Sequence, residues 1–413
     1  MRHPRMVFAQ VAATVLAAAT LAQTVPSATP AATPGPSPPK APSATVRVVP
    51  PSPDVTPDLA EAMPLDPNVV LLTGAPPEDE KKASKGELVV APIPISDPAV
   101  GTGLGVTTVY TFATSKTEHP SPPPTVGGGA FYTSNGSWGA AVGGKLYLAE
   151  DRYRVTFGAT VGSFNYDLFA AGANRESIPI TQELDGVLGQ ALVGLGKRWY
   201  AGVRASYMTT KVSRQHPSET PIPVPHDQLD STLLGLGVRV ERDSRNSVFY
   251  PTAGSRFQFY STHNDTALGS DFTYTKSWLL YTAYLALSEP LVLAVEGAGC
   301  YATDGGPFYS RCMFGSKNLL RGYTVGQYLN RWTLATQAEA RWRFANRWIG
   351  TAFVGVGEIQ PAFPKSVDTD SLPAVGVGVH WIAAPENMIT VRAEYAVGEG
   401  GLHGFYVAIG QAF

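Results

Sequence analysis

The sequence predicts an all-β protein, a transmembrane antiparallel β-barrel of sixteen strands. Charged residues make up only 15% of the 413 residues, and glycine is frequent, with 42 copies. Apolar and polar residues alternate over most of the chain. After the N-terminal region no segment stays apolar for the roughly 18 residues that a membrane helix needs. Alternation without long apolar runs is typical of strands that face lipid on one side and a barrel lumen on the other.

Residues 1–22 are predicted to be a secretory signal peptide. Arg2 and Arg5 supply its positive start, and an apolar, alanine-rich stretch follows from Met6 to Leu21. Thr20-Leu21-Ala22 provides a small-residue cleavage site. A membrane anchor is the alternative, but the apolar run is short and no second span follows. We therefore expect export, with the bacterial cell outer membrane as the destination.

Residues 23–87 have a different composition, dense in proline, alanine, serine and threonine. Such a segment cannot bury enough apolar surface to offset the entropy that it would lose on ordering. We therefore expect a disordered Pro/Ala-rich linker here, followed by the barrel domain in residues 88–413.

The segment from Trp332 to Phe344 shows the alternation most clearly. One face is apolar with aromatic ends, and the other carries Thr333, Ala335, Gln337, Glu339, Arg341 and Arg343. Trp332 and Trp342 lie ten positions apart on the apolar face. At about 3.3 Å per residue and a tilt of about 40°, they are separated by about 25 Å along the membrane normal. This distance matches the apolar band of a barrel, so the polar face is predicted to line the lumen.

The final segment, residues 404–413, alternates in the same way. Phe405, Val407, Ile409 and Phe413 share one face. An aromatic residue after alternating apolar residues resembles the C-terminal assembly signal of bacterial outer-membrane barrels. These four residues are therefore predicted to face lipid and to carry that signal.

Counting strands backward from residue 413 gives an even number, as a single-chain bacterial barrel requires. The predicted strands are 404–413, 387–397, 372–383, 347–358, 332–344, 290–300, 272–287, 254–262, 230–241, 198–211, 182–195, 153–168, 137–149, 126–133, 101–113 and 88–95. Short turns alternate with long loops, and we expect the short turns on the periplasmic side. The prolines of the first strand cannot donate to a ladder, which fits a strand at a seam.

Four segments of the barrel resemble the BamA/TamA superfamily of outer-membrane assembly factors, also called bacterial surface-antigen barrels. They are "VVAPIPISDPAVGTGLGV" (89–106), "RDSRNSVFYPTAG" (242–254), "LRGY" (320–323) and "VRAEYAVGEGGLHGFYVAIGQAF" (391–413). The resemblance spans the whole barrel. The Arg-Gly-Tyr tripeptide falls in the sixth extracellular loop of the strand count, where the family carries its signature.

The resemblance implies a weak seam between the first and last strands and a sixth loop that folds back into the lumen. Arg321, Gly322 and Tyr323 would form the functional part of that loop. In the family the arginine pairs with acids on the lumen wall. Glu339 is the predicted partner here, because its strand directly follows the loop and it faces the lumen. Glu394 also faces the lumen but has an arginine beside it, so a network of charges stays open as an alternative to a lone pair.

The sequence departs from the family in two places. Residues 23–87 are too few and too rich in proline for the polypeptide-transport-associated domains that precede the barrel in the best-known members. The aspartate of the family's F-x-D-x-G strand is replaced by Gly355, so another acid must pair with the arginine. Gly355 and Gly357 are expected to leave room for Tyr323 to lie against the wall beside Phe353.

The function predicted from this resemblance is the insertion or translocation of proteins, or lipids, at the outer membrane. A passive pore or a structural surface-antigen barrel is the alternative. An enzyme is not expected, because the sequence contains no G-x-S-x-G motif. His216 and His226 share a loop but lack a third metal ligand, and no metal or cofactor is expected.

The expected partners are outer-membrane lipids and substrate outer-membrane or exported proteins, bound by a monomeric barrel. A net charge of −2 gives no indication of nucleic-acid binding. Cys300 and Cys312 are the two cysteines of the chain, and in an exported protein a close pair can form a disulfide. This bridge would lie at the base of the sixth loop. The alternative is two small residues that never meet.

Overall fold

The computed structural model describes most of the chain from Glu87 onward. The described residues are 87–97, 99–112, 124–169, 177–215, 225–247, 250–314, 320–323, 328–359, 371–385 and 388–413. The predicted signal peptide and, apart from Glu87, the predicted linker lie outside the described residues. Within the described ranges no helix is long and apolar enough to cross a membrane.

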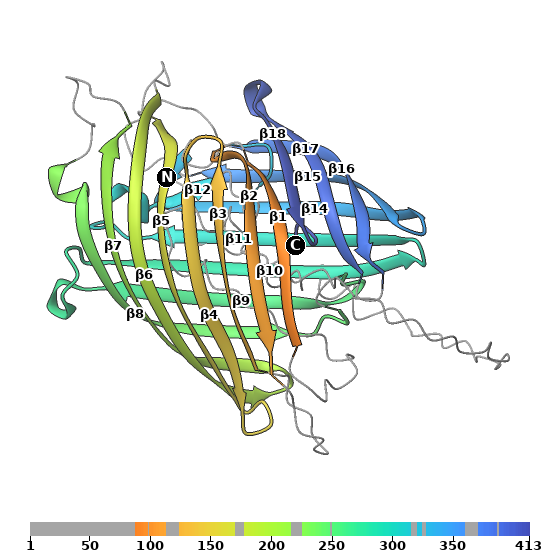
Figure 1. Cartoon of the computed structure of the whole chain (residues 1–413), viewed down its shortest axis with the longest axis horizontal. Coiled ribbons are helices and arrows are strands. Elements are labelled where there is room, and N and C mark those ends of the chain that lie inside the picture. The colour runs from red at the N-terminus through yellow and green to blue at the C-terminus, as the bar shows by residue number, and fades with distance from the viewer. Residues whose placement is uncertain are drawn as a thin grey trace, which may run out of the picture.

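Sixteen strands close into one antiparallel barrel, which confirms the predicted fold (Figure 1). The barrel strands are β1 (Glu87–Asp97), β2 (Gly101–Thr111), β3 (Thr125–Thr133), β4 (Trp138–Leu148), β5 (Tyr153–Phe169), β6 (Ser177–Gly196), β7 (Trp199–Arg214), β8 (Asp230–Asp243), β9 (Ala253–Asn264), β10 (Tyr274–Ser288), β11 (Leu291–Ala302), β14 (Trp332–Ala345), β15 (Trp348–Ile359), β16 (Leu372–Ala384), β17 (Ile389–Gly398) and β18 (His403–Ile409). Each coincides with one predicted strand, with ends shifted by a few residues. Within the described residues, four short 3-10 helices lie in the connections: η2 (His226–Gln228), η3 (Thr266–Leu268), η4 (Phe308–Ser310) and η5 (Glu399–Gly401).

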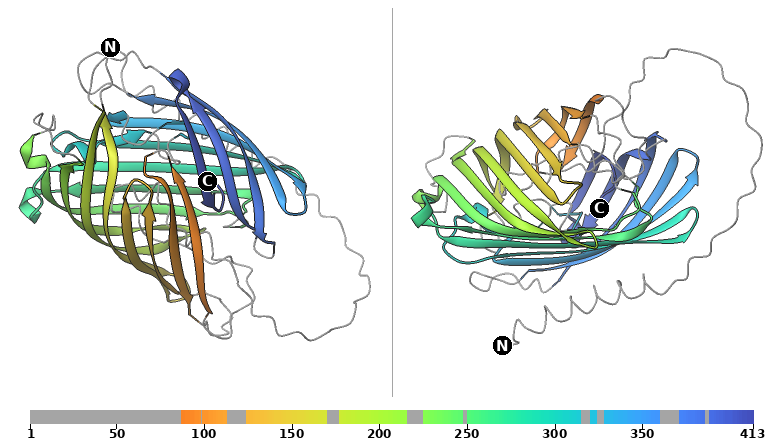
Figure 2. Two further views of the ribbon diagram at one scale, coloured as in Figure 1. Left: turned by 45° about the horizontal axis from the view of Figure 1, so that its top comes forward. Right: turned by 90° about the horizontal axis from the view of Figure 1, so that it is seen from below.

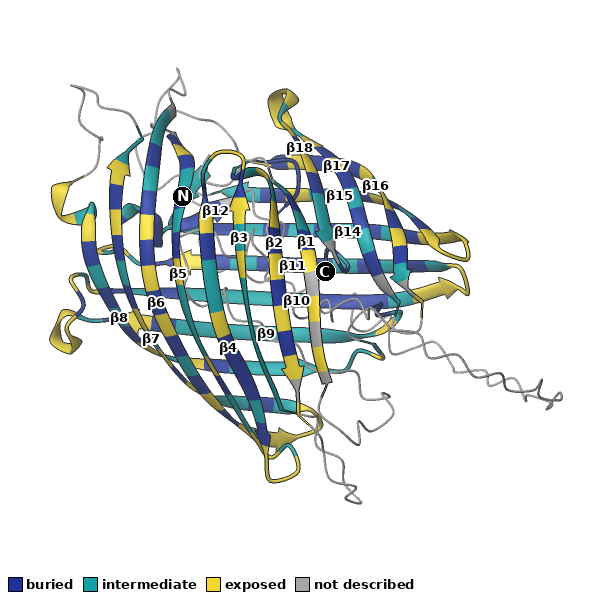
Figure 3. Cartoon of the chain, in the orientation of Figure 1, coloured by how far each residue is buried: buried dark blue, intermediate teal, exposed yellow. Residues whose placement is uncertain are grey.

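The two faces of the strands differ in burial, and Figure 3 shows buried and exposed residues alternating along them. In β14 the inward-facing Gln337, Glu339 and Arg341 are at most 1% exposed, whereas the outward-facing Trp342 is 57% exposed. Other large apolar side chains on the outside include Leu104, Val142, Val203, Val238, Val354 and Val377. An apolar exterior around a closed ladder is stable in a bilayer, because lipid covers the side chains and every strand has a partner on each side.

The connection between β11 and β14, residues 303–331, is the sixth loop, and part of it lies inside the barrel. It contains η4 and two short paired strands, β12 (Cys312–Phe314) and β13 (Tyr328–Asn330). Tyr309 and Met313 of this loop pack in an apolar cluster with inward-facing residues of six barrel strands. The strand members of the cluster are Ile93, Ile95, Phe164, Tyr166, Leu168, Ile180, Leu184, Met208, Val212, Leu233 and Tyr274. These residues lie toward the long loops, so this end of the lumen is filled by apolar side chains.

The seam between β1 and β18 has the shortest paired stretch of any two neighbouring strands in the barrel (Figure 2 gives two further views). Among the described residues its register pairs only Ser96 with Val407. The hydroxyl of Ser96 adds a bond by donating to the carbonyl oxygen of Phe405 at 3.3 Å. Pro92 and Pro94 of β1 have no N–H to donate, so the first strand contributes less to the ladder than its length suggests.

The last strand ends earlier than the sequence predicts. The alternating pattern predicts a strand to residue 413, but β18 ends at Ile409. Gly410 then adopts a φ of +85°, which costs glycine little, and the chain turns inward. The carbonyl oxygen of Phe413 accepts a hydrogen bond from the buried Arg341. The prediction that Phe413 shares the lipid face with Phe405 is therefore wrong.

Candidate functional site

The Arg-Gly-Tyr tripeptide of the sixth loop lies inside the lumen, between β12 and β13 in sequence. Arg321 is only 1% exposed and Tyr323 also 1%. Gly322 has a φ of +103°, and a Cβ added there would lie 3.0 Å from the carbonyl carbon of Val397 in β17. Both the backbone conformation and the close approach to β17 require glycine at this position. The loop backbone therefore touches the wall near the seam.

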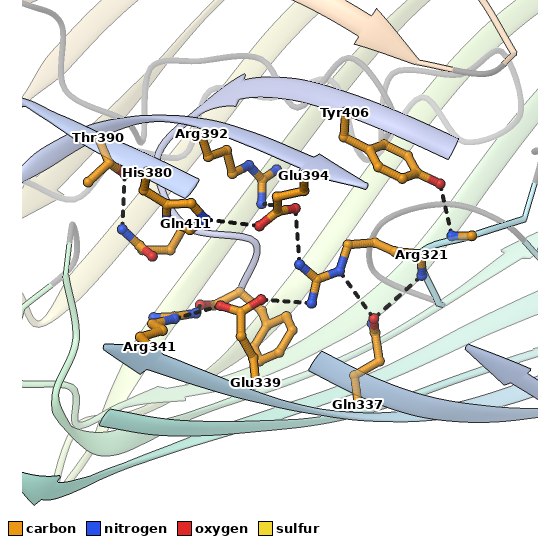
Figure 4. Close-up of polar contacts among 12 residues, drawn as sticks. Arg321, Gln337, Glu339, Arg341, His380, Thr390, Arg392, Glu394, Tyr406 and Gln411 are labelled. Carbon is orange, nitrogen blue, oxygen red and sulfur yellow. Dashed lines mark hydrogen bonds and ion pairs between the residues drawn. The ribbon is translucent and has the colours of Figure 1, made fainter. Parts of the chain in front are cut away.

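Arg321 pairs with two carboxylates that come from different strands (Figure 4). Its Nη2 lies 2.7 Å from Oε2 of Glu339 in β14, and its Nη1 lies 3.0 Å from Oε2 of Glu394 in β17. Its backbone N and Nε both donate to Oε1 of Gln337 at 3.4 Å. The predicted contact with Glu339 is present, and Glu394 joins it. One arginine thus bridges the strand that follows the loop and a strand next to β18.

The guanidinium of Arg321 also stacks on an aromatic ring. Its carbon Cζ lies 3.4 Å from the ring centroid of Phe353 in β15. A desolvated arginine on an aromatic face is stabilised by about 2 kcal/mol. Burial by itself would lower the pKa of Arg321, but the negative charges of Glu394 and Glu339 reverse the effect, and the net pKa lies above its usual value. The arginine is therefore held as a cation in the lumen.

Further charged groups extend the contact into a network. Arg341 Nε lies 2.7 Å from Oε1 of Glu339, and Arg392 Nη1 lies 3.6 Å from Oε2 of Glu394. His380 Nε2 lies 3.0 Å from the other oxygen of Glu394. The open alternative of a network, instead of a lone pair, is thus the arrangement present. We define the lumen network as Arg321, Glu339, Arg341, His380, Arg392 and Glu394.

Sequence reasoning missed His380 and the stacking role of Phe353. His380 is fully buried and belongs to the inward row of β16. The only signal was a polar residue in a row otherwise made of small and apolar residues, Leu372, Ala374, Gly376, Gly378 and Ile382. Phe353 was expected to lie beside the tyrosine of the loop, but its ring is covered by the arginine. Alternation identifies which side a residue faces, and it does not identify the residue opposite.

The segment after β18 contacts the same network. Arg341 Nη2 donates to the carbonyl oxygen of Phe413 at 2.6 Å. The ring centroid of Phe413 lies 5.5 Å from Cζ of Arg321 and 5.6 Å from that of Arg341. Gln411 donates to the hydroxyl of Thr390 at 3.0 Å. These contacts fix residues 410–413 inside the barrel.

The last strand also contacts the loop directly. The backbone N of Gly322 donates to the hydroxyl of Tyr406 in β18 at 3.0 Å (Figure 4). Tyr406 is itself 5% exposed and packs with Phe353. The tripeptide of the sixth loop is therefore bonded to the fixed wall through Glu339 and to the seam strand through Tyr406.

Tyr323 does not lie where the sequence predicts. The room above Gly355 is taken by Leu320, whose Cδ1 stands where a Cβ of residue 355 would clash with it. The hydroxyl of Tyr323 instead donates to the carbonyl oxygen of Pro373 at 2.5 Å and accepts from the N of Glu399 at 3.1 Å. The expected position beside Phe353 is therefore wrong, because the residue before the arginine occupies it.

The remaining predicted residues are distributed over the outside of the barrel and the base of the loop. Cys300 of β11 and Cys312 of β12 form a disulfide, with their Cα atoms 5.7 Å apart. Phe405 is 53% exposed on the outer face, and Val407 is half-buried there. The side chain of Ile409 lies outside the described part of the chain. The role of these residues as an assembly signal stays a prediction.

Metal ligation finds no support in the described ranges. They contain no group of three His, Cys, Asp or Glu side chains that could hold a metal ion. His226 lies in η2, and His216 lies outside the described residues. The lumen network thus offers ion pairing and hydrogen bonding as its chemistry.

A comparison with known families matches residues 134–413 to the Omp85 superfamily domain. The matched region contains the sixth loop, the lumen network and β18. No curated protein sequence gives a significant match to the chain.

Solved structures with the same fold are similar to this chain at low sequence identity. The crystal structure of BamA from Haemophilus ducreyi lacking POTRA domains 1-3 is 14% identical, with a TM-score of 0.56 over 81% of this chain and 74% of that one. CdiB from Acinetobacter baumannii is 11% identical, with a TM-score of 0.54 over 79% and 60%. CdiB from Escherichia coli is 10% identical, with a TM-score of 0.54 over 81% and 66%. The chain spans less than two thirds of either CdiB protein, and at these identities the likeness shows the fold alone.

Proposed function

The chain belongs to the Omp85 superfamily, and from this premise we propose that it inserts or translocates proteins, or lipids, at the bacterial outer membrane by opening its seam. The family match agrees with the resemblance to outer-membrane assembly factors in the sequence. As partners we propose the surrounding outer-membrane lipids and substrate outer-membrane or exported proteins. The proposed action of the barrel is mechanical and monomeric, with no covalent chemistry and no nucleic acid.

The observation that carries the proposal is the unequal pairing at the seam. β1 and β18 are in register at Ser96 and Val407, whereas β5 and β6 are in register from Tyr153↔Val193 to Phe169↔Ser177. A backbone hydrogen bond contributes about 0.5–1.5 kcal/mol net. Separating β1 from β18 therefore costs far less than separating other neighbours, so the barrel has one place where it can open laterally.

The sixth loop is placed to control that opening. Its arginine contacts Glu339 on β14 and Glu394 on β17, and its glycine is bonded to Tyr406 on β18. If β18 moves away from β1, the hydrogen bond between Gly322 and Tyr406 must stretch or break, and the ion pair with Glu394 is strained if β17 follows. We infer that the loop holds the seam closed until a substrate or lipid competes for the edge of β1.

A passive pore receives less support from the interior of the barrel. The apolar cluster around Tyr309 and Met313 occupies the lumen toward the long loops. An aqueous channel would favour polar side chains there. The structural surface-antigen alternative makes no use of the seam, so the same experiment separates it from the proposed function.

The test is a disulfide across the seam. Ser96→Cys with Val407→Cys joins the two residues that face each other at the seam. The matched control, Val106→Cys with Ala130→Cys, joins β2 to β3 at a register pair away from the seam. Both are prepared with the native pair Cys300–Cys312 already closed, and bridge formation is followed by gel mobility before and after reduction.

We expect the oxidised seam variant to fail to restore outer-membrane protein and lipid composition in cells that lack the gene, and to recover after reduction. Its ion conductance in planar bilayers should match that of the wild-type protein. The control variant should restore the composition fully when oxidised. Full restoration by the oxidised seam variant would contradict seam opening and favour a passive or structural barrel.

A further inference from the structure

A second group of cations lies on another part of the inner wall, away from the lumen network. We define the basic wall as Lys145, Arg154, Arg239 and Arg256. Lys145 near the end of β4 and Arg154 near the start of β5 flank one short turn. Arg239 near the end of β8 and Arg256 near the start of β9 flank another turn. Each of these turns follows an even-numbered strand of the antiparallel barrel, so both turns lie at the same end and the four side chains gather at one mouth of the lumen.

The acids near the basic wall are already engaged by two of its arginines. Arg154 binds Asp151 through Nε at 2.8 Å and Nη2 at 2.6 Å, and its Nη1 lies 3.3 Å from Glu241. The other oxygen of Glu241 lies 3.0 Å from Arg239 Nη2. The guanidinium of Arg154 also rests on the ring of Tyr200, 3.5 Å from its centroid. These contacts hold the arginines in fixed positions.

The remaining cations, Lys145 and Arg256, form no direct ion pair with a described residue. When the side-chain amide of Gln258 is oriented with its oxygen toward the arginines, that oxygen accepts hydrogen bonds from Arg239 Nη2 at 2.7 Å and from Arg256 Nη2 at 3.1 Å. A neutral amide between two guanidinium groups satisfies hydrogen bonds without cancelling charge.

Lys145 is the most exceptional member of the basic wall. It is only 7% exposed and faces inward in β4. Its ammonium forms no hydrogen bond or ion pair with a described residue. Its Nζ lies 5.3 Å from the centroid of the Tyr147 ring. Lysine is almost never buried without a partner, and an ammonium has three donors to satisfy. An anion bound beside Lys145 would supply the partner that the described side chains do not.

The charge balance indicates the size of the missing charge. Four cations act electrostatically on Glu241, and Asp151 is the second carboxylate of the wall. Asp243, opposite Arg256 in the β8–β9 register, is neutralised by Arg245 at 2.7 Å, which leaves an excess of two positive charges. A phosphate monoester carries about −1.5 to −2 at neutral pH and presents three acceptor oxygens. Arginine binds phosphate through two parallel N–H donors, and lysine binds it as a point charge. A carboxylate would neutralise only half of the excess.

We propose that the basic wall is a binding site for a phosphate monoester group at this mouth of the lumen, with Lys145 and Arg256, which form no ion pair within the described ranges, as its donors. The group can belong to a lipid headgroup or to free phosphate, which share this chemistry. The site is independent of the seam and of the proposed function.

The test uses the full-length protein in neutral detergent, at constant ionic strength, with calorimetric titration of three probes. Inorganic phosphate represents the free anion, short-chain phosphatidic acid the lipid headgroup, and short-chain phosphatidylcholine a headgroup without net charge. We expect saturable binding of phosphate or phosphatidic acid and none of phosphatidylcholine. If inorganic phosphate binds, the free anion is a sufficient ligand. If only phosphatidic acid binds, the ligand is a lipid headgroup.

Two variants and one matched control test the assignment to the basic wall. Lys145→Met and Arg256→Gln should each weaken binding about tenfold or more. Lys276→Met changes another buried, inward-facing lysine, on β10, whose Nζ donates to the carbonyl oxygen of Arg311 at 3.3 Å. It should leave binding unchanged. Unheated gel mobility confirms that each variant is folded. Absence of binding by the wild-type protein, or equal weakening by all three changes, would overturn the proposal.

Discussion

The wall of β5 and β6 and the seam of β1 and β18 are held together by different interactions. β5 and β6 pair along the full length of β5, so their stability resides in the backbone ladder. β1 and β18 share one register pair. β18 pairs with β17 from Val391↔Ile409 to Val397↔His403, and the hydroxyl of Tyr406 links it to the sixth loop through the lumen. Regular hydrogen bonding makes a wall that opens only by unfolding. A short ladder with a few side-chain contacts beside it makes a joint that can be released and formed again.

The largest effect is expected from removing the centre of the lumen network. Arg321→Ala leaves Glu339 and Glu394 buried without their shared cation, which should destabilise the barrel by about 3–5 kcal/mol. Chemical denaturation in lipid vesicles measures the loss. Arg321→Lys should recover only part of it, because a single ammonium lacks the fork that spans two carboxylates.

The matched control is Arg331→Ala in the same loop. Arg331 pairs with Asp304 at 2.9 Å, but its side chain is 38% exposed and that of Asp304 is 65% exposed. Exposed ion pairs contribute about 0–1 kcal/mol. An equal loss of stability in Arg331→Ala and Arg321→Ala would contradict the central place given to the network.

Removing the disulfide should have the next largest effect on stability, because the bridge anchors the sixth loop to the wall strand β11. Cys300 and Cys312 join the loop to β11, and closing a loop of this length stabilises a fold by about 3 kcal/mol. We expect the thiols of denatured wild-type protein to resist alkylation until a reductant is added. Cys300→Ser with Cys312→Ser should lower barrel stability without changing the pairing of β18. Ready alkylation before reduction would show that the bridge is absent.

The two ion pairs of Arg321 can be separated by double-mutant cycles. Glu339→Gln tests the contact with β14, and Glu394→Gln tests the contact with β17 next to the seam. Each cycle with Arg321→Ala should give a coupling energy of about 0.5–3 kcal/mol, since the residues touch. If only the Glu394 cycle gave additive effects, Arg321 would be coupled to β14 but not to β17, and its link to the seam would be contradicted.

A smaller effect is expected from the aromatic residue that turns into the lumen. Burial of a whole phenylalanine side chain contributes about 1.5–3 kcal/mol, and Phe413 is only half-buried. Phe413→Ala should therefore loosen β18 modestly, whereas Phe405→Ala on the lipid face should not. If Phe413 also acts as an assembly signal, its removal should lower the amount of barrel in the outer membrane before any change in stability is measurable. Normal amounts would restrict its role to the contact with Arg321 and Arg341.

The sequence predicted features that depend on one strand alone and did not predict contacts between distant strands. Period-two alternation predicted all sixteen strands and placed Glu339 in the lumen, since the side that a residue faces follows from its own strand. Contacts across the lumen, such as those of Arg321 with Glu394 and with Phe353, depend on the diameter and tilt of the closed barrel, which no single strand encodes. Phe413 was misplaced because one glycine with a positive φ ends a pattern that otherwise continues.

Hydrogen exchange of the barrel in lipid vesicles tests the comparison most directly. If side chains hold the seam and the ladder holds the wall, amides of β18 should exchange faster than those of β5 and β6 in the wild-type protein. Arg321→Ala should accelerate β18 further and leave β5 and β6 unchanged. Equal protection of β18, β5 and β6 in the wild-type protein, or a uniform acceleration of all three in the variant, would contradict the account.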